Sequence, residues 1–144
     1  MKKSYNLIIF AALLVVVLFC FVACDTAVQG PKYDNGVYVG YGKFASDLRN
    51  YSVDLQVHIS DNKISKIVIL SGPTVSSDSV SGTPTNNKAW KEGKDALVAK
   101  IVSMNIADIL AVDATATTFS ESELCIEGAR GESAALVLAV QDAL

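Results

Sequence analysis

The amino-acid sequence predicts an α+β fold, in which a small antiparallel β-sheet has helices packed on one face. The alternation of apolar and polar residues that is typical of strands is confined to residues 37–70. Apolar residues recur at helical spacing only later, at residues 90–104 and 132–144. Strands followed by helices predict an antiparallel sheet with one face covered and the other face in water.

The predicted strands form a meander, and they lie at residues 37–44, 51–60 and 64–70. The middle strand is the clearest, because its polar residues alternate with apolar residues that point to one face: Val53, Leu55, Val57 and Ile59. On the returning strand, Ile67 and Ile69 share a face. The glycines of the first strand, Gly40 and Gly42, predict a close approach of another part of the backbone.

The second half of the chain predicts loops and helices. Residues 71–87 are rich in Ser and Thr and are interrupted by Pro and Gly, so we expect a long loop there. A helix capped by Asn86 or Asn87 follows, and its core face carries Trp90, Leu97, Ile101 and Met104. Residues 106–112 predict either a short extended piece or a helix end. The last helix is predicted at residues 132–144, and the side chains that we expect to face the core are Ala135, Leu138, Ala139 and Ala143.

The first residues of the chain have the profile of an export signal. Lys2 and Lys3 supply a positive end, and residues 7–23 contain no charge. This block ends in Ala23-Cys24, which resembles the bacterial lipobox, in which the cysteine carries a diacylglycerol. An uncleaved anchor is an alternative, because 17 residues are close to the lower limit for spanning a bilayer. A second alternative is that Cys24 is an ordinary buried thiol.

The lipoprotein interpretation divides the chain into three parts. Residues 1–23 are the signal peptide, residues 24–35 are the lipid anchor and tether, and residues 36–144 are the folded domain. We therefore expect a membrane-anchored lipoprotein that lies outside the cytoplasm, in the periplasm or at the cell surface. Its membrane contact is made through the lipid on Cys24.

Composition excludes several classes of protein. The chain has 144 residues and a net charge of −3, which is unlike a basic nucleic-acid binder. Apolar residues are too frequent for a disordered chain, and a multi-pass membrane protein would need more than one long apolar block. With Cys24 lipidated, Cys125 is left without a disulfide partner in the domain. His58, the one histidine, fits a plain strand residue, and no Cys/His spacing predicts a metal site.

Four local patterns occur in order along the chain. Residues 35–42 are similar to an opening "DGxYxGxGxG" strand, and residues 52–67 to a "VxVxVxIxDGKIxxI" hairpin. Residues 96–114 resemble "AxxxLxxxIxxxxxxxVDA", and residues 139–144 resemble a terminal "AVxxAL". Together these patterns resemble the FMN-binding domain family, which includes small exported lipoproteins and the flavin-carrying subunits of ion-pumping electron-transfer complexes. The resemblance implies an α+β domain that binds FMN.

The flavin-attachment motif of that family, "DAVSGATxTS", lies between its two helices, and residues 112–120 stand there in this chain. Asp113 and Ala114 match the motif. Without a gap, Thr117 replaces the Gly, Thr118 the Ala, and Phe119 the residue whose hydroxyl is esterified to FMN. A shifted alignment places Ala116-Thr117 on "AT" and Ser120 on the final Ser. A second string, residues 78–85, is close to "DxVSGAT" but has Pro84 at the acceptor position.

The resemblance implies a phosphate site in which Asp113 orients a loop and the hydroxyl groups of four residues donate to the phosphate: Thr115, Thr117, Thr118 and Ser120. Tyr38 or Tyr41 would flank the ring. FMN is expected to be bound without a covalent link. We therefore expect an extracytoplasmic electron-transfer protein with FMN and redox proteins as partners, rather than a stand-alone enzyme. The alternative is a flavin-free binding or structural module on the same fold. A hydrolase has no supporting motif.

Overall fold

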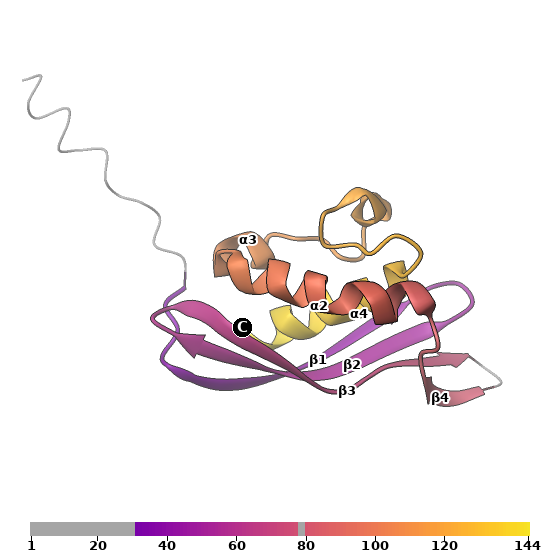
Figure 1. Cartoon of the computed structure of the whole chain (residues 1–144), viewed down its shortest axis with the longest axis horizontal. Helices are drawn as coiled ribbons and strands as arrows, with labels where there is room; N and C mark the ends of the chain where they lie inside the picture. Colours follow the sequence, from indigo (N-terminus) through magenta and orange to yellow (C-terminus); the bar gives the residue numbers. More distant parts are fainter. Residues whose placement is uncertain (1–30, 78–79) are drawn as a thin grey trace, which may run out of the picture. The chain divides into compact units, whose positions relative to one another are not determined.

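The computed structural model describes residues 31–77 and 80–144, and Figure 1 shows strands in the first half of this part and helices in the second. Pro31–Leu144 forms a compact unit. The predicted signal peptide and Cys24 lie outside the described residues. Within residues 31–77 and 80–144, no helix combines the length and the apolar character that crossing a membrane requires.

Four antiparallel strands form one sheet in the order β1-β2-β3-β4, at Gly36–Ala45, Asn50–Ser60, Lys63–Ser77 and Val80–Pro84. The alternation predicted for the middle strand is confirmed, since four side chains of β2 are buried against the helices: Val53, Leu55, Val57 and Ile59. Together with the helices that cover this face, the sheet confirms the predicted α+β fold (Figure 1).

The prediction of a long loop at residues 71–87 is wrong for most of that segment. β3 continues to Ser77, and β4 pairs with it through Val75 opposite Thr83 and Thr74 opposite Pro84. β-branched Thr and Val suit a strand, and a proline is tolerated on an edge strand, where one row of backbone N–H groups has no partner strand. The Ser/Thr-rich composition that predicted a loop therefore belongs to an edge hairpin.

The helix α2 (Lys88–Ser103) begins at Asn87, whose Oδ1 accepts a hydrogen bond from the Ala89 amide at 3.0 Å. Asn87 is therefore the cap, of the two candidates. The predicted core face is confirmed for Trp90, Leu97 and Ile101, which are buried, while Met104 lies half-buried just past the end of the helix. The segment that was ambiguous in the sequence is a short helix, α3 (Ile106–Leu110), and a 3₁₀ turn, η1 (Thr117–Glu121), follows it.

The last helix, α4 (Arg130–Ala143), begins two residues earlier than predicted and is the centre of the core. Ala135, Ala139 and Ala143 are buried as expected, whereas Leu138 is only half-buried. α4 also buries its first turn, including Glu132 and Ser133. The reason is that α4 is covered on several sides, by the sheet, by α2 and by η1, and not on one face alone.

Two glycines of β1 let α4 lie directly on the strand. A Cβ atom at Gly40 would stand 1.9 Å from the Ala139 carbonyl oxygen, and one at Gly42 would stand 2.0 Å from the Ala135 carbonyl oxygen. No side chain fits in these positions, so the predicted close backbone approach is confirmed. β1 is also an edge strand, and its Tyr41 amide donates a hydrogen bond of 2.9 Å to Oδ2 of Asp142 on α4.

Burial of the α2 core face leads to a stability prediction. Leu97 is 4% exposed, so Leu97→Ala should lower the free energy of unfolding by about 2–5 kcal/mol through lost apolar contacts and the cavity left behind. Leu48, which is 84% exposed, provides the matched control, and Leu48→Ala should change the free energy by less than about 0.5 kcal/mol. Urea denaturation measures both, and equal effects would contradict the packing described here.

Candidate functional site

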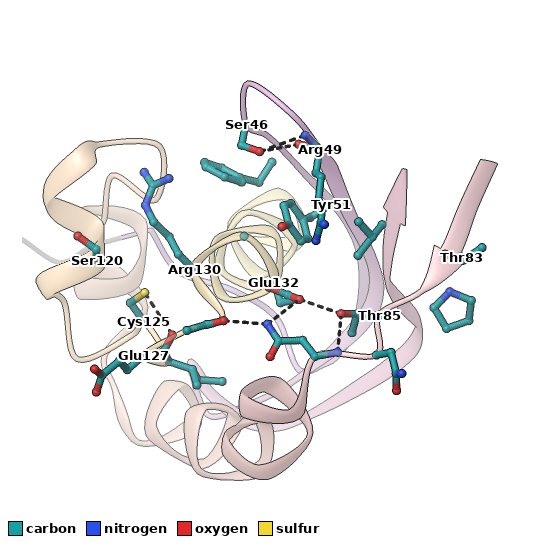
Figure 2. Close-up of a pocket in the computed structure, with 18 residues that line it drawn as sticks. Ser46, Arg49, Tyr51, Thr83, Thr85, Ser120, Cys125, Glu127, Arg130 and Glu132 are labelled. Carbon is teal, nitrogen blue, oxygen red and sulfur yellow. Dashed lines mark hydrogen bonds between the residues drawn. The ribbon is translucent and has the colours of Figure 1, made fainter. Parts of the chain in front are cut away.

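The main cleft of the described chain has a volume of about 840 Å³ and opens where four segments meet. These segments are the loop between β1 and β2, the link between β4 and α2, the segment from η1 to α4, and the start of α4. Figure 2 shows the side chains that line it, with Ser46, Arg49 and Arg130 in the upper part of the view and Glu132 and Thr85 below them. The cleft therefore has a cationic part and a part that contains a carboxylate.

Arg130, the first residue of α4, supplies one of the two cations. Its guanidinium carbon lies 4.9 Å from the centre of the Phe44 ring, and its Nη2 donates to the carbonyl oxygen of Ala116 at 3.0 Å. A cation over an aromatic face is attracted by the ring quadrupole, and the carbonyl contact restrains it further. The guanidinium has five N–H donors, so donors remain for a ligand.

Arg49 supplies the second cation from a closed turn. The Ser46 amide donates to the Arg49 carbonyl oxygen at 2.8 Å, and the Ser46 hydroxyl donates to the same oxygen at 2.9 Å. The exposed Arg49 side chain stands at the mouth of the cleft (Figure 2). Two guanidinium groups thus line the cleft, and arginine binds phosphate or carboxylate through paired hydrogen bonds.

The start of α4 is shaped by two glycines. Gly128 has a φ of +78°, the left-handed conformation that glycine adopts readily, and it turns the chain into the helix. Gly131 accommodates the Tyr51 ring, since a Cβ atom there would lie 2.3 Å from Cε2 of Tyr51. No side chain caps this helix end, so its first amides are available for another acceptor.

Glu132 joins three elements at the other part of the cleft. Its side chain is 3% exposed, and its Oε1 accepts hydrogen bonds from Thr85 Oγ1 at 2.8 Å and from Asn87 Nδ2 at 3.1 Å. Asn87 Nδ2 also donates to the Gly128 carbonyl oxygen at 2.8 Å. The network holds the end of β4 and the starts of α2 and α4 together (Figure 2).

Cys125 lines the same cleft and is the only cysteine in the described part of the chain. Burial raises the pKa of its thiol, and the positive charge of Arg130 opposes that effect. A raised pKa keeps the thiol protonated at neutral pH, which is typical of a structural cysteine. Among residues 31–77 and 80–144, no cluster of His, Cys, Asp and Glu could hold a metal ion.

The loop with the predicted phosphate donors is closed on itself at its start. Oδ1 of Asp113 accepts from Thr115 Oγ1 at 2.6 Å, from the Thr115 amide at 3.0 Å and from the Ala116 amide at 3.1 Å. These hydrogen bonds, the one from the Thr115 hydroxyl foremost, lower the pKa of Asp113. The carboxylate therefore takes one of the four hydroxyl groups that the resemblance assigned to a phosphate, that of Thr115. Ala114 is buried and packs in the core.

The other predicted donors are divided between two hollows. Ser120 lines the main cleft, where its hydroxyl donates to the Thr117 carbonyl oxygen at 3.0 Å. Thr115 and Thr117 line a second hollow of about 460 Å³, next to Lys43. Thr118 is exposed and lines neither hollow. Arg130 lines both, so it connects the predicted loop with the main cleft.

The remaining candidates from the sequence lie away from the cleft or only partly in it. The Tyr38 hydroxyl donates to the Asp34 carbonyl oxygen, and Tyr41 is exposed on the uncovered face of the sheet. His58 lies on that same face. The second string similar to the motif falls partly outside the described residues, but Thr83 and Pro84 from it line the cleft.

Sequence reasoning missed the residues that shape the cleft most: Phe44, Arg49, Tyr51, Arg130 and Glu132. One sequence pattern could have indicated three positions close to Arg130 and Glu132. Gly128, Ala129 and Ser133 have the spacing of the Gly, Ala and final Ser in "GATxTS", upstream of the terminal "AVxxAL" pattern at residues 139–144. In that alignment, which needs no gap before the end of the helix, Arg130 stands at the acceptor position.

Comparison with known proteins adds no identity to this geometry. No protein family, no curated protein and no solved structure matches the chain. The function is therefore argued from the cleft, from the charges on its walls and from the local sequence patterns described above.

Proposed function

We propose that this chain is an extracytoplasmic lipoprotein whose domain binds FMN reversibly in the main cleft and serves electron transfer. The observation that carries the proposal is the pair of arginines, Arg49 and Arg130, on a cleft that also has aromatic and aliphatic walls. Its volume of about 840 Å³ falls within the range of small-molecule sites, which are mostly apolar with a few polar groups that fix orientation.

The donor chemistry of the cationic part fits a phosphate. Arg49 and Arg130 would hold it through charge-assisted hydrogen bonds, and the hydroxyl groups of Ser46 and Ser120 line the same cleft. The uncapped start of α4 adds amide donors and the positive end of a helix dipole. When bound, the flavin supplies the electron-transfer chemistry, while the chain binds it, orients it and limits its contact with water.

The apolar part of the cleft fits a planar ring. Tyr51 and Ile126 line it, and both pack against the core. Arg130 already covers the Phe44 ring, so Tyr51 is the aromatic side chain that we assign to the flavin. Tyr51 is held against Gly131, which fixes its position before any ligand binds. Electron transfer to a partner would pass through the open side of the cleft.

FMN should bind reversibly and should not become esterified. The alignment on Gly128-Ala129 places Arg130 at the acceptor position, and the alignment on residues 113–120 places Phe119 there; neither side chain has a hydroxyl. Titrating FMN with the purified chain should quench flavin fluorescence. A denaturing gel under ultraviolet light should show a dark band, because only covalent flavin survives denaturation. A fluorescent band from cells with a flavin transferase would contradict this expectation and point to Thr117 or Thr118.

A flavin-free binding module is the second candidate. The specific observation in its favour is that the Asp113 carboxylate already accepts the donors of Thr115 and Ala116. A chain that is colourless as purified and does not quench added FMN at micromolar concentration would favour this module. The cleft and its arginines would then serve another anionic ligand.

Lipidation of Cys24 is tested separately from flavin binding. The motive is the basic start of the chain, the uncharged block and the Ala23-Cys24 pair. Cys24→Ser should leave a full-length precursor and abolish labelling by a radioactive fatty acid. Cys125→Ser is the matched control, and labelling and processing should not change. Normal processing of the Cys24→Ser chain would contradict the lipoprotein interpretation, because cleavage would not depend on the thiol.

A further inference from the structure

The buried carboxylate of Glu132 is not explained by the phosphate site. In the described part of the chain, the ion pairs are Lys88–Glu92 and Lys100–Glu123, so no cation pairs with Glu132. Two neutral groups, Thr85 Oγ1 and Asn87 Nδ2, donate to its Oε1. A carboxylate that is 3% exposed is costly unless its oxygens accept hydrogen bonds, so the second oxygen requires an account.

The second oxygen, Oε2, accepts no hydrogen bond from any described residue, since both donors to Glu132 reach Oε1. In residues 31–77 and 80–144, the only side-chain polar atom that is both fully buried and without a hydrogen-bond partner is Nε2 of His58. Oε2 of Glu132 is therefore not fully buried. Because Glu132 lines the cleft, its Oε2 must have its remaining access there. The cleft therefore contains a carboxylate oxygen, Oε2 of Glu132, to which no described residue donates.

Arg130 and Glu132 point to different parts of the cleft. Residues two apart on a helix diverge by about 200° around its axis. Figure 2 shows the same separation for Arg130, whose guanidinium points to the upper left of the view, away from Glu132, which accepts from Thr85. A ligand that touches both parts must carry an anion at one end and a hydrogen-bond donor at the other.

We infer that Glu132 forms a donor-recognising subsite, which accepts the ring N3–H of a flavin while the arginines hold the phosphate. The inference rests on the proposed function, and it fixes the direction in which the flavin lies. Phosphate and ring stand at opposite ends of the ribityl chain, and the Arg130 guanidinium and the Glu132 carboxylate likewise point to different parts of the cleft. N3–H is the N–H donor of the oxidised ring, so it is the group that a carboxylate would select.

Flavins with and without that donor test the subsite on the full chain purified in detergent. The fluorescence of riboflavin should be quenched when it binds. 3-Methylriboflavin, which lacks the N3–H, should bind at least about 10-fold more weakly, because a buried charged acceptor would lose its donor. Equal affinity for the two flavins would overturn the inference and leave the proposed function standing. Binding of neither FMN nor riboflavin would overturn the proposed function, and the inference would fall with it.

Glu132→Gln provides the matching variant. Its amide oxygen must keep accepting from Thr85 and Asn87, so its NH₂ group faces the cleft and meets the ligand N–H as a second donor. We expect about 10-fold weaker riboflavin binding and no remaining discrimination against 3-methylriboflavin. Glu121→Gln, which removes the same charge from an exposed side chain that lines neither hollow, should change neither affinity by more than about 2-fold. Unchanged or tighter binding by Glu132→Gln would overturn the inference, and a variant that fails to fold leaves the wild-type comparison decisive.

Discussion

Replacing Arg130 by glutamine should weaken FMN binding by about 10- to 100-fold, because a charge-assisted hydrogen bond to the phosphate is lost. Riboflavin has no phosphate, so its affinity should change by less than about 3-fold. The ratio of the two affinities, from fluorescence titrations at fixed salt, is therefore the informative quantity. Arg130→Lys should fall between, since it keeps the charge but loses the paired geometry of the guanidinium.

Lys63→Gln is the control for the loss of a positive charge. Lys63 is exposed at the start of β3 and lines neither hollow. Its replacement should leave both affinities within about 2-fold of wild type. If Arg130→Gln weakens the binding of riboflavin and of FMN equally, Arg130 does not act by binding phosphate. It would then act by holding Phe44 and the Ala116 carbonyl oxygen in place.

Gly42→Ala should destabilise the domain by about 3 kcal/mol or more, because overpacking against rigid backbone cannot be relieved by a side-chain rotation. The new methyl group would lie 2.0 Å from the Ala135 carbonyl oxygen and 2.4 Å from the Ala139 amide nitrogen. α4 would have to move away from β1, and with it the first turn that lines the cleft. Urea denaturation measures the loss of stability.

Gly82→Ala, in β4, is the matched control. A Cβ atom there would lie 3.6 Å from Thr74 Oγ1, which is ordinary van der Waals contact, and the position is exposed. The stability should change by less than about 1 kcal/mol. If Gly42→Ala were as mild as this control, the close packing of α4 on β1 would be contradicted.

The sequence predicted those elements whose pattern is local. Alternation along β2 and the helical spacing of Trp90, Leu97 and Ile101 follow from the period of each element and the side that it buries. β4 could not be predicted in the same way, because its Ser, Gly, Thr and Pro have the composition of a loop. Its pairing with Val75 and Thr74 on β3 decides its structure. The all-round burial of the α4 first turn also depends on tertiary contacts.

The candidate site was harder to predict than the fold. Ser120 does line the main cleft, and Thr115 and Thr117 lie in the hollow beside Arg130. Arg49 and Arg130 could not be paired from the sequence, since β1, β2 and α4 must first assemble to bring them to one cleft. The hydroxyl-rich stretch from Thr115 to Ser120 drew the prediction because hydroxyl groups suit phosphate, whereas the structure uses the first of them to satisfy Asp113.

The hydrogen bond from the Tyr41 amide to Asp142 has a consequence for assembly. An edge strand exposes free backbone amides with which a strand of another molecule can pair. The Tyr41 amide is not available to such a strand, because it already donates a hydrogen bond to the Asp142 carboxylate on α4. A second molecule that added its strand to β1 would have to expel Asp142 and leave its negative charge against the incoming carbonyl oxygens. α4 therefore both completes the core and disfavours the pairing of a second molecule's strand with β1 at Tyr41.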